Sequence, residues 1–152
     1  MADWSALEAE VAGHLRALAD GGFVVLEAPG APARDAVVRP RRLGGLLAER
    51  RRAERPYAQA IRIGAALRAE LAGPPSLGGT FPWTDEEQAR ILAHGWAVPD
   101  DGPVFATPNY VRTWRDHAGD AEAAATALVA ALRDLAHCPD AAGVVVQAHP
   151  NG

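Results

Sequence analysis

Residues 80–114 have the sequence TFPWTDEEQARILAHGWAVPDDGPVFATPNYVRTW, which is more informative about the fold than the rest of the chain. The stretch holds three of the four tryptophans. Thr84 and Glu87 stand three residues apart ahead of an apolar run, a spacing that predicts a capping box at the start of a helix. These are turn and packing signals, which are typical of a scaffold rather than of a catalytic apparatus.

The helix that follows this box is expected from residue 85 to residue 94. Its pattern turns Ile91 and Leu92 toward the core, and Gly95 is the expected stop. The acidic residues of its first turn are explained by their favourable interaction with the helix dipole. We therefore interpret them as structural rather than catalytic.

Two further helices are predicted by apolar residues that recur every three or four positions. The first spans residues 4–18 and has Asp3 as its cap. The second spans residues 121–136 and has Asp120 as its cap. Both patterns place one apolar stripe on each helix, as expected of helices that cover a sheet.

Short β-branched or alternating runs predict the strands. Residues 23–28 form one candidate, and residues 57–63 and 67–71 form a hairpin that turns at Gly64. Two more short strands are expected at 104–106 and 110–114, around the Pro108-Asn109 turn, and a closing strand is expected at 144–146.

The segment 31–56 has the weakest pattern in the chain. Val37-Val38 suggests a short strand, and residues 43–53 suggest either a helical turn or a mobile loop. Seven arginines fall between Arg39 and Arg55, so this segment is locally basic on a chain whose formal net charge is −4. We expect an arginine-rich loop or insertion within a single domain that spans residues 1–152.

Together these elements predict an α+β fold, an antiparallel sheet packed with helices in the order α-β-β-β-α-β-β-α with a possible closing strand. The acidic balance argues against a general nucleic-acid binder. No apolar run approaches the roughly 20 residues needed to span a bilayer. Cys138 is the only cysteine, so an internal disulfide is impossible and a cytoplasmic location is expected.

Catalytic or metal-binding constellations are not evident. The five histidines show no metal-ligand spacing, and neither HExxH nor CxxC occurs. No cofactor is predicted, and neither glycine pair continues into a phosphate-binding motif. Cys138 is weighed as a nucleophile and, alternatively, as a small residue at a helix end.

Two surface features remain as candidate binding groups. The aromatic residues either fill the core or line a groove for a partner's side chains, and Trp83 is the one expected to be partly exposed. The arginine run either belongs to a solvated loop whose charges aid solubility or attracts acidic segments of a partner. The hypothetical peptide-binding residues are Trp83, Trp96, Tyr110, Trp114, Arg41, Arg42, Arg50, Arg51 and Arg52.

The motif LAHGW-x-x-P at residues 92–99, then PNYVRTW at 108–114 and an Ala/Leu-rich helix, resembles the TY-Chap domains of actinobacteria. Those domains are related to the YbjN-like and type III secretion chaperone-like proteins. The resemblance spans residues 4–136, although its motifs consist of packing and turn residues. It implies a curved antiparallel sheet with helices, no catalytic residues, a surface that holds a segment of another protein, and self-association as a homodimer.

Three functions therefore remain open. The first is a non-catalytic module that binds a partner protein by strand addition or by apolar anchors. The second is an accessory subunit of a peptide-modifying or secretion system. The third is an enzyme of unrecognised type that uses Cys138 or a histidine.

Overall fold

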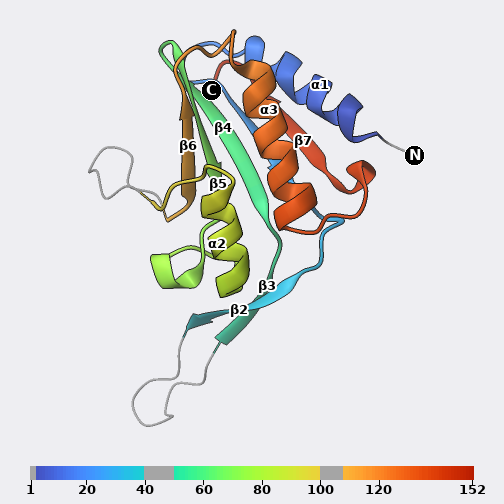
Figure 1. Ribbon diagram of the computed structural model, residues 1–152, viewed down its shortest axis with the longest axis vertical. Helices are drawn as coiled ribbons and strands as arrows, with labels where there is room; N and C mark the ends of the chain where they lie inside the picture. Colours follow the sequence, from blue (N-terminus) through green and yellow to red (C-terminus); the bar gives the residue numbers. More distant parts are fainter. Residues whose placement is uncertain (1–2, 40–49, 100–107) are drawn as a thin grey trace.

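The computed structural model describes residues 3–39, 50–99 and 108–152, and Figure 1 shows its architecture. The helices in these ranges are α1 (Trp4–Arg16), α2 (Asp85–Ala93) and α3 (Ala121–Ala130), the last continued by a π-helical turn, η3 (Ala131–Leu135). The strands are β1 (Phe23–Glu27), β2 (Arg34–Arg39), β3 (Arg50–Glu54), β4 (Tyr57–Ile63), β5 (Ala66–Leu71), β6 (Tyr110–Trp114) and β7 (Val145–His149). Short 3-10 turns are η2 (Pro75–Leu77) and η4 (Ala141–Gly143).

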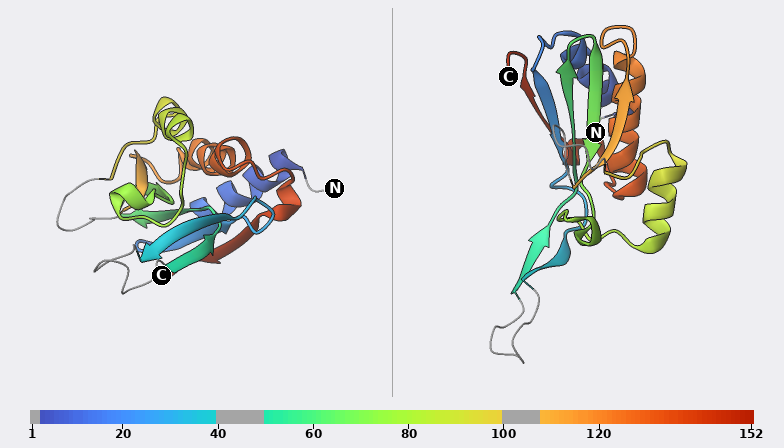
Figure 2. Two further views of the ribbon diagram at one scale, coloured as in Figure 1. Left: turned by 90° about the horizontal axis from the view of Figure 1, so that it is seen from below. Right: turned by 90° about the vertical axis from the view of Figure 1, so that its left-hand side faces the viewer.

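Five strands form one antiparallel sheet in the order β6-β5-β4-β1-β7, whereas β2 and β3 pair with each other as a separate hairpin. Helices α1 and α3 lie side by side on one face of the large sheet, and Figure 2 shows the strands beneath them. The predicted α+β fold, an antiparallel sheet packed with helices, is confirmed. The β2–β3 hairpin extends away from the large sheet at one end (Figure 1).

Small side chains let the helices approach this sheet closely. Ala58, Ala60 and Ala69 point toward the helices and are fully buried. Leu15 of α1 and Leu128 of α3 supply the bulk that fills the space above them. The core therefore mixes leucines and alanines from both layers, since Leu26 and Leu71 of the sheet and Ala124 of α3 are also fully buried.

Several local predictions are confirmed. The carboxylate of Asp3 accepts a hydrogen bond from the Ser5 backbone N–H at 3.0 Å and caps α1. The hairpin β4–β5 turns at Gly64, whose φ of 60° lies in the left-handed region that glycine adopts without strain. The capping box of α2 is present in full, with Thr84 and Glu87 bonding each other's backbone N–H groups.

Other predictions are wrong or lie outside the described residues. Leu92 does not face the core: its side chain is 46% exposed, and Ile91 alone of the pair is buried. Asp120 occupies the N-cap position of α3, but its carboxylate accepts from the Asp116 backbone N–H and not from an N–H group of the helix. The strand expected at 104–106 lies outside the described residues.

The segment 43–53 also differs from its prediction. Residues 50–53 belong to strand β3, which pairs with β2, and not to a helical turn or a loop. Residues 43–49 lie outside the described ranges. Backbone pairing with β2 holds these arginines in an extended conformation. The strand could not be predicted from apolar periodicity, because residues 50–52 carry no apolar side chains.

Candidate functional site

One face of the large sheet carries no helix in the described part of the chain (Figure 2). Because strand side chains alternate and Val24 and Leu26 are fully buried beneath the helices, their neighbours must point to the other side. The same argument applies to β4 and β5, and the register of β7 with β1 places Val145, Gln147 and His149 on the same side. We call this surface the helix-free face; its central side chains are Phe23, Val25, Glu27, Tyr57, Gln59, Ile61, Ile63, Arg68, Glu70, Val145, Gln147 and His149.

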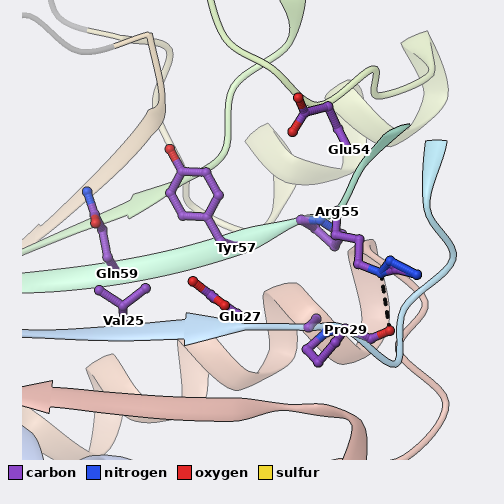
Figure 3. Close-up of a pocket in the computed structure, with 9 residues that line it drawn as sticks. Val25, Glu27, Pro29, Glu54, Arg55, Tyr57 and Gln59 are labelled. Carbon is purple, nitrogen blue, oxygen red and sulfur yellow. Dashed lines mark hydrogen bonds between the residues drawn. The ribbon is translucent and has the colours of Figure 1, made fainter. Parts of the chain in front are cut away.

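A cavity of about 480 Å³ lies on this face where β1 and β4 meet the base of the β2–β3 hairpin. Val25, Tyr57 and Gln59 line its sheet side, and Figure 3 shows them on the near side of the strands with the helices behind. Arg55 closes the other side, where its Nε donates to the carbonyl oxygen of Pro29 at 3.3 Å. We call this depression the sheet cavity.

The charges around the sheet cavity are mixed. Glu27 and Glu54 contribute carboxylates, and Arg55 contributes the one cation among its lining residues. Glu54 is itself paired with Arg52, whose Nε lies 3.2 Å away. The lining therefore carries no excess of positive charge.

A second cavity of about 240 Å³ adjoins the first and shares Gln59 with it. Phe23 and Ile61 supply its apolar walls, and Glu70 supplies a carboxylate. The ring of Phe23 stacks on His149 of the neighbouring strand at 4.5 Å. The two cavities together give the helix-free face a hollowed strip that runs along β1 and β4.

A hydrogen-bonded network borders this strip. The amide nitrogen of Asn109 donates to the Tyr57 hydroxyl at 3.0 Å and to Glu70 at 3.4 Å. The amide oxygen of Asn109 accepts from the Gly73 backbone N–H at 3.1 Å, and Gln59 donates to the other Glu70 oxygen at 3.2 Å. The network therefore positions the side chains of Tyr57 and Gln59 along the strip.

The predicted aromatic contact residues lie elsewhere. Trp83 is only 5% exposed, so the expectation that it is partly exposed is wrong. Trp96 and Tyr110 are equally buried, and the Tyr110 hydroxyl donates to Gln88 at 3.1 Å. Trp114 is half-buried beneath the guanidinium of Arg112, which lies 5.1 Å from its ring. The structure therefore brings none of the four onto the helix-free face.

The predicted arginine contacts are only partly described. Arg41 and Arg42 lie outside the described residues, while Arg50, Arg51 and Arg52 belong to β3. The Arg52 side chain is 73% exposed. Binding of a partner by this group stays a prediction.

A charged cluster centred on the buried Glu87 joins the hairpin to α2. Two N–H groups of Arg34 donate to the two carboxylate oxygens of Glu87 at 2.5 and 2.7 Å. His137 Nε2 lies 3.1 Å from the second oxygen, and the Glu87 side chain is only 8% exposed. The hydrogen bonds from Arg34 and Thr84 outweigh burial and lower the Glu87 pKa to about 2. The cluster therefore ties β2, α2 and the end of η3 together.

This cluster predicts a specific acid sensitivity. Because the folded-state pKa of Glu87 lies below its ordinary value of 4.5, its stabilisation is present above pH 4.5 and is lost as the pH falls toward 2. Between pH 6 and pH 3 we expect the wild type to lose about 2 kcal/mol more free energy of unfolding than Glu87→Gln. Urea denaturation of both proteins at the two pH values measures the difference, and parallel losses would contradict the assignment.

Comparison with known proteins identifies the family to which the chain belongs. The family model described as "TY-Chap3: T3SS (YopN, CesT) and YbjN peptide-binding chaperone 3" matches residues 1–150. The chain belongs to the TY-Chap3 family. Neither a curated protein nor a solved structure matches it. The resemblance inferred from the motifs around β6 is thereby confirmed.

The side chains of this TY-Chap3 chain do not assemble a recognisable reactive centre in the described residues. Cys138 is buried and its thiol donates to the Asp140 carbonyl oxygen at 3.4 Å. Burial raises the pKa of the thiol, which disfavours the reactive thiolate. Within residues 3–39, 50–99 and 108–152 no group of three potential ligands is placed to hold a metal ion, and no helix there is long and apolar enough to cross a membrane.

Sequence reasoning missed the residues that shape the helix-free face of this TY-Chap3 domain. Gln59 and Glu70 sit on the polar side of a predicted hairpin, and their alternation was the available signal. Asn109 was assigned only to a turn, although it is buried and bonded to residues about 40 to 50 positions away. No local pattern announces contacts over that separation.

Proposed function

We propose that this TY-Chap3 chain binds an extended segment of a partner protein across the helix-free face and catalyses no reaction on it. The observation that carries the proposal is the hollowed strip on a sheet face that no helix of the described residues covers. The family's description as a peptide-binding chaperone supports the same role.

The chemistry of the strip favours alternating side chains. Val25, Ile61 and Phe23 offer apolar contact within two adjoining cavities. An extended segment presents every second side chain to such a surface, and its backbone amides can bond the polar groups of Gln59 and Tyr57. The bound segment is then anchored by apolar residues at alternate positions.

The charge of the strip indicates which charge the bound segment should carry. The carboxylates of Glu27, Glu54 and Glu70 outnumber the guanidinium of Arg55 among the lining residues of the two cavities. A neutral or basic segment is therefore favoured here over the acidic segment expected from the arginine run.

The test uses peptide arrays that cover the products of genes next to this one, with the strongest binder titrated by fluorescence anisotropy. We expect Val25→Arg to weaken binding at least tenfold, since it fills the sheet cavity and adds a charge that the peptide must bury. Ala6→Arg is the matched control, because Ala6 is exposed on α1 away from this face. Affinity that is equal in both variants, with both folded by circular dichroism, would refute the proposal.

A further inference from the structure

A third cavity lies on the helix-covered side of the sheet, where α3 passes the edge strand β6. It has a volume of about 340 Å³ and is independent of the helix-free face. Trp96 and Leu135 contribute large apolar side chains to it, and four alanines with Thr126 contribute the wall along α3 and its continuation. We call it the α3 groove; its lining residues are His94, Trp96, Arg112, Ala123, Thr126, Ala127, Ala130, Ala131 and Leu135.

Arg112 gives this groove a preorganised cation. Its guanidinium lies 5.1 Å from the ring of Trp114, and Nη1 donates to the carbonyl oxygen of His94 at 2.8 Å. That carbonyl is its one hydrogen-bond acceptor among the described residues. A guanidinium has five N–H donors, so its contacts within the described residues leave donors for a carboxylate.

The sign of the charge in the α3 groove differs from that of the whole chain. Among the described residues its lining includes Arg112 and His94 and no carboxylate, whereas the chain carries a formal net charge of −4. The groove therefore combines an apolar cavity with a single fixed positive group. A ligand that satisfies both must carry an apolar group and a carboxylate close together.

We propose that the α3 groove captures the carboxy-terminal residue of a partner protein. The apolar side chain enters the cavity against Trp96 and the alanines, and the terminal carboxylate pairs with Arg112. A terminal residue fits because one residue carries both groups, within reach of a cavity that Arg112 itself lines. An internal acidic residue would need a second residue to supply the apolar group.

The experiment titrates ¹⁵N-labelled protein with three acetylated dipeptides and follows its amide signals by NMR. Acetyl-Ala-Leu with a free carboxylate is expected to shift the signals of Ala127, Ala130 and the Arg112 side chain. The amide-terminated form should bind at least tenfold more weakly, and so should acetyl-Glu-Leu-amide. Equal binding of either amide would overturn the proposal.

Variants separate binding from folding. Arg112→Gln removes the cation and Ala127→Leu fills the cavity. Each variant should weaken binding of acetyl-Ala-Leu at least tenfold. Arg115→Gln is the control, because it makes the same charge change at an exposed residue that does not line the groove. Shifts confined to the helix-free face, or unchanged affinity in Ala127→Leu, would refute the assignment. Shifts in the groove that depend on protein concentration without peptide would mean contact between copies and would also refute it.

Discussion

Trp83→Ala is expected to lower the free energy of unfolding by about 4 kcal/mol, as removal of a buried tryptophan typically does. The indole is 5% exposed and packs edge-on against Phe81 with 4.5 Å between ring centroids. Its N–H donates to the carbonyl oxygen of Ala72 at 2.7 Å. The substitution thus leaves a cavity and an unpaired carbonyl in the core, at the point where the end of β5 meets the approach to α2.

Chemical denaturation measures this loss, and two variants calibrate it. Trp83→Phe keeps an aromatic ring but removes the hydrogen bond, so about 1–2 kcal/mol is expected. Trp114→Ala should cost less than Trp83→Ala, because Trp114 is only partly buried against the core. A Trp83→Ala protein of near wild-type stability that had lost peptide binding would instead restore Trp83 as a contact residue.

The elements that were predicted well are those encoded by neighbouring residues. The capping box of α2 needs only Thr84 and Glu87, and the β4–β5 hairpin needs only alternation around Gly64. Such signals act within one element, so a single sequence displays them. The family resemblance also rested on local residues, the turn and packing motifs at 92–99 and 108–114.

The candidate site was harder to predict because it depends on sheet register. Pairing of β4 with β5 sets Gln59 opposite Glu70, and pairing of β5 with β6 brings Asn109 close to both. Neither pairing is visible in composition or periodicity. Burial was also difficult to predict: Trp83, which follows a proline, was expected to be partly exposed and instead contributes to the core.

Charge was equally misleading in the arginine-rich segment. A run of arginines suggested a loop, yet β3 is held extended by its pairing with β2. Arg34 was not singled out at all, although it makes the bidentate contact that joins this hairpin to α2. Its partner Glu87 was correctly placed in a capping box. Glu87 therefore both caps α2 and pairs with Arg34, and the sequence indicated only the cap.

Arg34→Ala is the second change with a large expected effect, a loss of about 3 kcal/mol in the free energy of unfolding. Removing one partner of a buried ion pair leaves the other charge uncompensated, which typically costs 3–5 kcal/mol. The Arg34 side chain is 25% exposed, so we expect the lower end of that range. The guanidinium also lies 5.0 Å from the ring of Phe81 and donates to the carbonyl oxygen of Pro82, and both contacts would be lost.

Urea denaturation at pH 7 measures the effect, and Arg16→Ala is the control. Arg16 makes a 2.8 Å ion pair with Glu122 on the surface, so its loss should cost no more than about 1 kcal/mol. The double variant Arg34→Ala/Glu87→Gln should be more stable than the sum of the single losses predicts, because the neutral amide no longer leaves a buried charge. Additive losses would mean that Arg34 acts through its contacts with Phe81 and Pro82 and not through Glu87.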